Sequence, residues 1–344
     1  MGTAPTGVLT TDGRVTYRLF RDLDADLPGM AAANQANRAA MGILEPADLS
    51  SMRNNYERLV NSVATRDILL AELDGRIVAY VRTSWSDQFD GSRVYEVTLF
   101  LDPAAWDRGI ARTLIGWAGD HHRRLVADDP ATHPPGGSRW LQVYAFDGDR
   151  EIADAAAAAG YRIVRREAEM LRDRLDDVLP DVPLPDGFTI RPITPELVRP
   201  LWDAGFEAFA DSYGESVPTE TDFEKWRDDP RNDFSLALVA FHGEAIASFV
   251  LNILDRQPDG SVRGQLGGVA TLAPYRRRGL ARALVARSLA LLRDHGATSA
   301  YLGVDLQNPN QALTLYSSCG FRVVNGGFIY RQPLDGPWPE EPSA

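Results

Sequence analysis

Three consecutive arginines and a glycine stand out as residues that could bind a charged ligand: Arg276, Arg277, Arg278 and Gly279. The stretch 265–272 before them is short, apolar and rich in glycine, which predicts a buried strand. Apolar residues at helical spacing follow as far as Gly296, which predicts a helix. A helix start has unpaired N–H groups and the positive end of the dipole, and glycine lets a phosphate approach. The sequence therefore predicts a phosphate-ligand site at this strand–helix turn, although the dinucleotide and P-loop patterns are absent.

Two segments carry a resemblance to a known superfamily. Arg276-x-x-Gly279-x-Ala281 resembles the Q/R-x-x-G-x-G/A acetyl-CoA loop of the GCN5-related N-acetyltransferase (GNAT) superfamily. The segment from Asn308 to Phe321 resembles its second signature, N-x-x-x-A-x-x-L-Y-x-x-x-G-F. Because both occur in the expected order, the chain is identified as a member of this superfamily. The resemblance implies direct transfer of acetyl from acetyl-CoA to an amine.

The resemblance also assigns roles around acetyl-CoA, which is a co-substrate. The residues it places there are Val269, Ala270, Thr271, Arg276, Arg277, Arg278, Gly279, Leu280, Ala281, Arg282 and Asn308. It implies that the N–H groups of 277–282 bind the pyrophosphate and that the pantetheine lies along 269–271. Tyr316 matches the superfamily's tyrosine and is expected to protonate the leaving thiolate, with a purely structural aromatic as the alternative. No metal is expected.

The general base is less evident from the sequence. An acceptor amine of pKa ~10.4 costs about 4.6 kcal/mol to deprotonate at pH 7, so a base is useful. Many superfamily members use a glutamate on the strand before the loop, but this chain has Gln265 and Leu266 there. Asp305 and Asp255, each at the end of a predicted strand, are weak candidates. The first half of the chain has Glu96 at the corresponding position.

The chain also repeats itself at a nearly constant separation. Four pairs of segments match in order: 15–18 with 188–191, 73–79 with 241–247, 107–111 with 277–281, and 160–164 with 320–324. This predicts an α/β protein of two tandem GNAT-like domains, each with a mixed, mostly antiparallel sheet flanked by helices. We expect domains at 1–178 and 188–332, a proline-rich linker at 179–187 and a tail at 333–344.

The two copies differ at the positions with polar roles. Trp106, Gly148 and Ala156 replace Arg276, Asn308 and Tyr316 in the first copy. We therefore expect catalysis in the second copy, with the first as a structural partner and a wall of the acceptor cleft. A second acetyl-CoA bound without catalysis is the alternative, because backbone N–H groups alone can hold a phosphate.

Composition limits the partners. With 344 residues, a net charge of −12 and 44% hydrophobic residues, the chain resembles an ordinary globular protein and is unsuited to nucleic acid. The lone Cys319 and the lack of a long apolar run predict a cytoplasmic protein that does not bind membranes. We also expect a monomer or homodimer. We expect a small-molecule amine as acceptor. Several aromatic residues within 200–229 could line its pocket or form helix core: Trp202, Phe206, Phe209, Tyr213 and Trp226.

Three other functions remain possible from the sequence. A mycothiol-synthase-like enzyme shares the tandem architecture. A non-catalytic acyl-CoA sensor or scaffold would not need Tyr316. Aminoacyl-tRNA-dependent peptidyltransferases also pair two such domains, but the acidic charge and the intact acetyl-CoA loop oppose that function.

Overall fold

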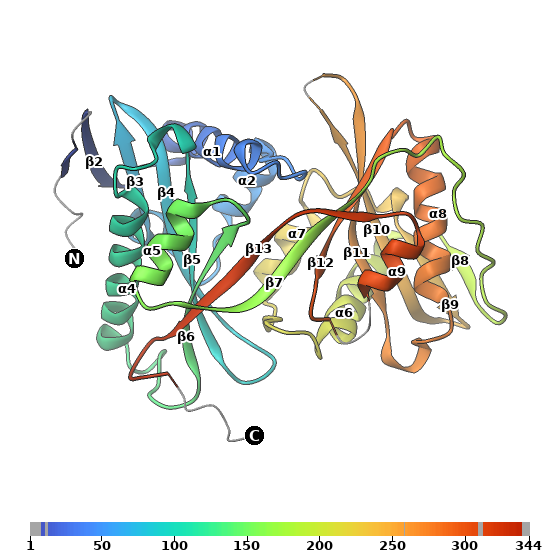
Figure 1. Ribbon diagram of the computed structural model, residues 1–344. Helices are drawn as coiled ribbons and strands as arrows, with labels where there is room; N and C mark the ends of the chain where they lie inside the picture. The colour runs from blue at the N-terminus through green and yellow to red at the C-terminus, as the bar shows by residue number, and fades with distance from the viewer. Residues whose placement is uncertain (1–7, 11–12, 258, 309–311, 339–344) are drawn as a thin grey trace. The chain divides into compact units, whose positions relative to one another are not determined.

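The computed structural model describes residues 8–10, 13–257, 259–308 and 312–338 (Figure 1). The chain divides into two units. Unit 1 comprises Met1–Arg166 and Gly327–Ala344, and unit 2 comprises Glu167–Gly326. Each unit is a sheet flanked by helices, so the predicted α/β class with two similar domains is confirmed.

Unit 1 has a mixed sheet of order β1-β2-β3-β4-β5-β6-β13. Its strands are β1 (Val8–Thr10), β2 (Gly13–Leu19), β3 (Ile68–Leu73), β4 (Arg76–Asp87), β5 (Arg93–Leu101), β6 (Arg139–Phe146) and the second half of β13 (Arg322–Pro333). Its helices are α1 (Leu23–Ala40), α2 (Leu49–Glu57), α3 (Ala64–Asp67), α4 (Ile110–Asp128) and α5 (Arg150–Ala158). Only the β5–β6 pair is parallel among the registers found in this unit.

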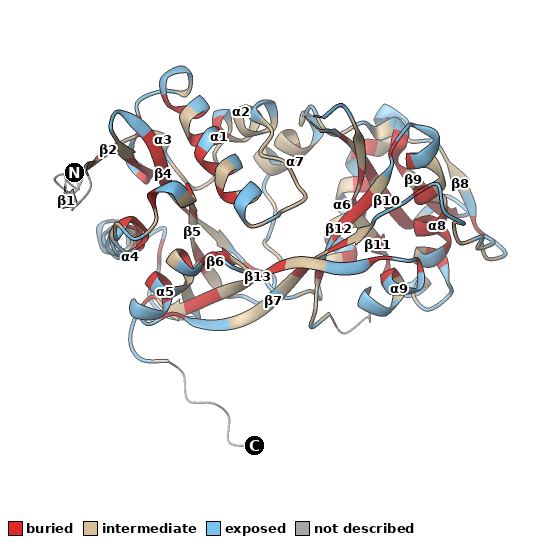
Figure 2. Cartoon of the chain, turned by 45° about the horizontal axis from the view of Figure 1, so that its top comes forward, coloured by how far each residue is buried: buried red, intermediate tan, exposed pale blue. Residues whose placement is uncertain are grey.

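Alternating side chains make two cores in unit 1, one on each face of the sheet. Ile68 and Leu70 of β3 pack toward α1 and α2, whereas Leu69 and Ala71 pack toward α4. All four are buried, as expected for a strand covered on both faces. Figure 2 shows buried residues concentrated on the strands and on one side of each long helix.

Unit 2 repeats this plan with the order β7-β12-β11-β10-β9-β8. Its strands are the second half of β7 (Arg162–Arg172), then β8 (Thr189–Arg191), β9 (Leu238–His242), β10 (Ala245–Arg256), β11 (Val262–Thr271) and β12 (Ser299–Asp305). Its helices are α6 (Val198–Phe209), α7 (Glu220–Arg227), α8 (Leu280–Asp294) and α9 (Ala312–Ser318). The predicted helix end is confirmed: α8 stops before Gly296, whose φ of +88° suits glycine.

Two strands pass from one unit to the other. Residues Glu167–Arg172 of β7 pair with β12 in unit 2, and residues Gly327–Pro333 of β13 pair with β6 in unit 1. The glycines at the crossing are sterically required. A Cβ on Gly326 would overlap the Glu167 carbonyl oxygen, and one on Gly327 would overlap the Tyr144 hydroxyl. Each unit thus completes its sheet with a strand from beyond the boundary that the proline-rich segment suggested.

The proline-rich segment 179–187 lies within unit 2. Leu175, just before it, is fully buried in the unit 2 core, and Arg287 of α8 donates to the Val182 carbonyl oxygen at 2.6 Å. The described part of the expected tail belongs to unit 1, where Leu334 is buried and Trp338 lies 5.3 Å from Trp140, ring to ring. Residues 339–344 lie outside the described ranges.

Candidate acyl-CoA site in unit 2

The loop between β11 and α8 has the geometry of an anion site. Arg277 and Gly279 both have positive φ, +61° and +86°, and Gly279 is the N-cap of α8. The N–H groups in the first turn of an α-helix have no partner within the helix. Gly279 has no side chain that could cap them. A Cβ on Gly279 would meet no atom within 4 Å, so the space beside it is open to a ligand. These features fit a pyrophosphate.

A cavity of about 660 Å³ opens beside this loop. It is bounded by the end of α6 and the segment after it, by β11, by the start of α8, by the end of β12 and by α9. The structure brings nearly all predicted site residues to its wall: Val269, Ala270, Thr271, Arg276, Arg277, Gly279, Leu280, Ala281, Arg282, Asp305, Asn308 and Tyr316. Arg278 is the exception, because its guanidinium turns to the Pro274 carbonyl oxygen and the Tyr275 ring.

The guanidinium of Arg276 is already engaged. It donates to the Ala208 carbonyl oxygen at 2.8 Å, to the Thr271 carbonyl oxygen at 3.1 Å and to the Asp211 carboxylate at 2.6 Å. These contacts tie the loop to the end of α6 and offset the charge of Arg276. The other arginines that line the cavity are Arg277 and Arg282.

A β-bulge lies on the strand that borders the cavity. The β10–β11 register shifts between Leu251 and Asn252, which pair with Gly268 and Leu266, so Gly267 is the extra residue. A bulge frees backbone groups from the ladder, and Gly267 lines the cavity. This bulge was not predicted from the sequence, although two adjacent glycines inside a strand are a signal for one.

Tyr316 lies on α9 and is only 7% exposed. Its ring meets Phe321 edge to face at 6.2 Å, and burial raises the pKa of its phenol. No residue in the described ranges hydrogen-bonds its hydroxyl, and the side chain lines the cavity. A phenol in this setting stays protonated at neutral pH and is able to donate. Residues 309–311 of the second signature lie outside the described ranges.

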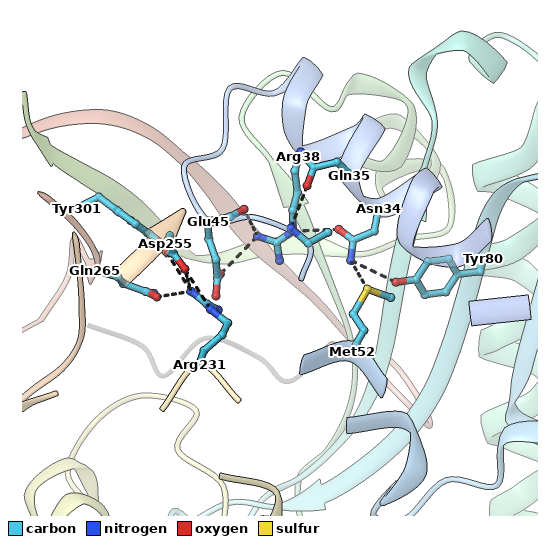
Figure 3. Close-up of polar contacts among 11 residues, drawn as sticks. Asn34, Gln35, Arg38, Glu45, Met52, Tyr80, Arg231, Asp255, Gln265 and Tyr301 are labelled. Atoms are coloured by element: carbon cyan, nitrogen blue, oxygen red, sulfur yellow. Dashed lines mark hydrogen bonds and ion pairs between the residues drawn. The ribbon is translucent and has the colours of Figure 1, made fainter. Parts of the chain in front are cut away.

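The two residues that the sequence offered as a base, Asp305 and Asp255, lie in different places. Asp305 lines the cavity, and its carboxylate accepts from the Gln307 N–H at 2.9 Å. Asp255 is buried, contacts Arg231 at 3.0 Å and accepts from the Tyr301 hydroxyl at 2.5 Å (Figure 3). Because Asp255 is absent from the cavity lining and already carries two partners, the structure does not bring it to the site.

Gln265 presents an oriented amide to the cavity. Arg231 donates to its Oε1 at 2.6 Å (Figure 3), which fixes the side-chain flip because guanidinium only donates. Its Nε2 therefore faces away from Arg231, and none of the described residues accepts from it. Gln265 is thus a hydrogen-bond donor at the position where the sequence analysis sought a base.

The loop region before α7 contributes residues that no sequence pattern indicated. Glu215, half-buried, lines the cavity together with Ser212, and burial raises the pKa of its carboxyl. Among the aromatic candidates, Phe209 and Tyr213 line the cavity. The other three form a ring cluster on α6 and α7, with Trp202 at 4.6 Å from Phe206 and 5.1 Å from Trp226.

The corresponding loop of unit 1 has a similar backbone conformation, but one of its N–H groups is hydrogen-bonded within the unit. Asp107 and Gly109 have φ of +62° and +71°, like their counterparts in unit 2. The Asp107 N–H, however, donates to the Glu151 carboxylate at 3.0 Å. The β4–β5 register is also continuous, without the bulge of unit 2. Unit 1 therefore satisfies part of its loop with its own carboxylate.

No group of three or more histidine, cysteine or acidic residues in the described ranges is placed to hold a metal ion. None of the helices in those ranges combines the length and apolar character that a bilayer crossing requires.

Two similar halves, each with a mixed sheet whose strand leads into a glycine-capped helix start, define the fold class. Solved structures support that class. The chain resembles a GCN5-related N-acetyltransferase from Sphaerobacter thermophilus with TM-score 0.69 and 23% identity, covering 94% of this chain and 96% of that one. It also resembles a tandem GNAT protein from the clavulanic acid biosynthesis pathway, with TM-score 0.65 and 16% identity, covering 94% and 99%.

The model of the acetyltransferase (GNAT) family matches residues 34–128 and 202–321. The chain belongs to this family, which uses acetyl-CoA, and the match falls in both units. It is 32% identical to a mycothiol acetyltransferase of Thermomonospora curvata over 56% of this chain. That match spans 64% of the relative, less than two thirds of its length. A mycothiol acetyltransferase of Salinispora tropica is 31% identical over 75% of this chain and 78% of its own length.

Proposed function

We propose that this protein is an acetyl-CoA-dependent N-acetyltransferase that acetylates an amine of a small molecule, with catalysis in unit 2. The observation that carries the proposal is the joint placement of Gly279, the bulge at Gly267 and Tyr316 on one cavity wall. Family membership supports acetyl transfer in general. When bound, acetyl-CoA supplies a thioester carbonyl open to attack by an amine.

Backbone groups of unit 2 bind and orient the co-substrate. The free N–H groups of the α8 first turn, with Arg277 and Arg282, hold the pyrophosphate. The strand segment 269–271 runs beside the pantetheine arm. Backbone N–H freed at the bulge is available to polarise the thioester oxygen, which is the role of an oxyanion hole.

Tyr316 supplies the proton for the departing sulfur. Tyr316 lines the cavity, and its phenol carries a proton at neutral pH because burial raises its pKa. A CoA thiolate has a pKa like that of cysteine, ~8.5, so the raised pKa does not itself favour the transfer, and the assignment rests on the position of the hydroxyl. The buried hydroxyl thus serves as a general acid. Unit 1 lacks a tyrosine at the matching position, Ala156, and its loop N–H is taken by Glu151. We infer that unit 1 does not catalyse the transfer.

A mycothiol-type acceptor is a specific form of this proposal. Relatives named mycothiol acetyltransferase at about 30% identity favour it. The oriented Nε2 of Gln265 suits an acceptor that carries an oxygen near its amine, such as an amide, a hydroxyl or a carboxylate.

A thiol-release assay tests the proposal. Purified protein is incubated with acetyl-CoA and a panel of amines: amino acid amides, amino sugars, aminoglycosides, short peptides and the amine that lacks only the acetyl group of mycothiol. We expect thiol release that depends on one class of amine, with the acetylated product seen by mass spectrometry. Binding of acetyl-CoA without release for any amine would instead support a sensor or scaffold.

A further inference from the structure

Glu215 is a carboxylate that the proposed function has not used. It lies between α6 and α7, is half-buried and lines the unit 2 cavity. No residue in the described ranges hydrogen-bonds its carboxylate or forms an ion pair with it. Asp305, the other carboxylate on this wall, is instead engaged by the Gln307 N–H. A carboxylate without a protein partner, facing a ligand cavity, is free to accept a proton from a ligand.

Glu215 shares the cavity wall with several other titratable and charged groups. The titratable and charged side chains on the same wall are Tyr213, Tyr275, Arg276, Arg277, Arg282, Asp305 and Tyr316. Burial raises the pKa of Glu215, and no arginine among the described residues forms an ion pair with it. A carboxyl of raised pKa is a better match to the proton of an ammonium than an ordinary one.

We propose that Glu215 is the general base that deprotonates the acceptor ammonium; this inference rests on the proposed function. One N–H proton passes to Glu215, the amine nitrogen bonds to the thioester carbon, and the carbon–sulfur bond breaks. Tyr316 gives its proton to sulfur, and a second N–H proton of the new amide returns to the phenolate. The proton on Glu215 leaves to solvent, so the site is restored.

The test compares Glu215→Gln with Glu207→Gln, an exposed glutamate of α6 outside the cavity lining. The acceptor is the amine of the panel with the highest kcat/KM. At pH 7 we expect Glu215→Gln to lower kcat about 10²- to 10⁴-fold, the usual range for loss of a general base. The Kd of acetyl-CoA should stay unchanged. The loss should shrink as pH rises toward the pKa of the amine, where the acceptor deprotonates unaided. Glu207→Gln should match wild type throughout.

Several outcomes would overturn the assignment. These are wild-type rates in Glu215→Gln, a loss that stays constant with pH, or pH rescue in Asp305→Asn instead. A ¹³C titration of the Glu215 carboxyl in the unaltered protein gives a readout without an acceptor, and a pKa at or below the ordinary ~4.3 would also contradict the proposal. If the wild-type protein acetylates no amine, the proposed function is wrong. If wild type is active but Glu215→Gln is equally active, only the assignment of Glu215 as the base is wrong.

Discussion

At the residue scale, Tyr316 is both a packed core residue and the proposed general acid. Its ring is part of the unit 2 core, yet its side chain reaches the cavity wall. Tyr316→Phe keeps the ring and removes the proton. We expect kcat to fall roughly tenfold to a thousandfold with little change in acetyl-CoA affinity, because protonation of a thiolate of pKa ~8.5 assists departure but is not indispensable at pH 7. Steady-state kinetics where chemistry limits the rate measure this. Wild-type turnover would assign Tyr316 to packing alone.

His122 of α4 makes a second residue-scale prediction, for stability. The ring is fully buried in unit 1, its Nε2 lies 3.0 Å from the Glu96 carbonyl oxygen, and burial lowers its pKa to about 4. His121 and His133 lower this pKa further, whereas Asp67 opposes them. The unfolded chain takes up the proton first, near pH 6.5, so the free energy of unfolding falls as pH drops from about 6.5 to about 4.

That loss amounts to about 3 to 4 kcal/mol at most, because the pKa falls from 6.5 to about 4 and a tenfold change in proton affinity is worth about 1.36 kcal/mol. His122→Gln retains a donor and cannot titrate in this range, so we expect a flatter pH dependence of the denaturation midpoint in urea. His295→Gln, at the exposed end of α8, serves as control and should keep the wild-type slope. Equal slopes in all three proteins would contradict this account of His122.

At the element scale, the loop between β11 and α8, the proposed acyl-CoA site, is tied to the end of α6 and the residues after it. Arg276 joins the two elements through Asp211, whose side chain is 57% exposed. Ion pairs this exposed contribute about 0.2–1 kcal/mol, so Asp211→Asn should weaken acetyl-CoA binding by no more than about fivefold. Calorimetry measures it, with Asp203→Asn, which loses a comparable pair with Arg199, as control. Tighter binding in Asp211→Asn would mean that the pair holds Arg276 away from the phosphate.

At the scale of the whole molecule, β7 and β13 each contribute residues to both units, and this determines where a stable fragment must begin and end. A fragment 188–332 lacks Glu167–Arg172, the strand that pairs with β12, and it lacks the fully buried Leu175. The loss of a buried leucine alone costs about 2–5 kcal/mol. A fragment 167–326 retains both. We expect cooperative unfolding by near-ultraviolet circular dichroism only for 167–326. Equal folding of the two fragments would contradict the strand assignment.

Features of the site that depend on local sequence were predictable, whereas those that depend on contacts between distant parts of the chain were not. Gly279 was predictable because a helix start leaves a local pattern, and Tyr316 because the segment Asn308 to Phe321 resembles a GNAT signature. The partner of Arg276 was not, because Asp211 meets it only after α6 packs against β11. Glu215 has no local pattern, and its raised pKa arises from burial in the folded unit. The division between the units could not be predicted because β7 and β13 each continue without a break from one unit into the other.

The central proposal is that the acetyl-CoA used in the reaction binds at the glycine-capped loop of unit 2. Gly279→Ala and Gly109→Ala form a matched pair: both glycines have positive φ, and a Cβ at either meets no atom within 4 Å. Each variant thus bears a similar backbone strain, about 1–2 kcal/mol. In a calorimetric titration with acetyl-CoA we expect Gly279→Ala to lose at least about tenfold in affinity, or about 1.4 kcal/mol, and Gly109→Ala to bind like wild type. Wild-type affinity in Gly279→Ala, or an equal loss in Gly109→Ala, would contradict the account.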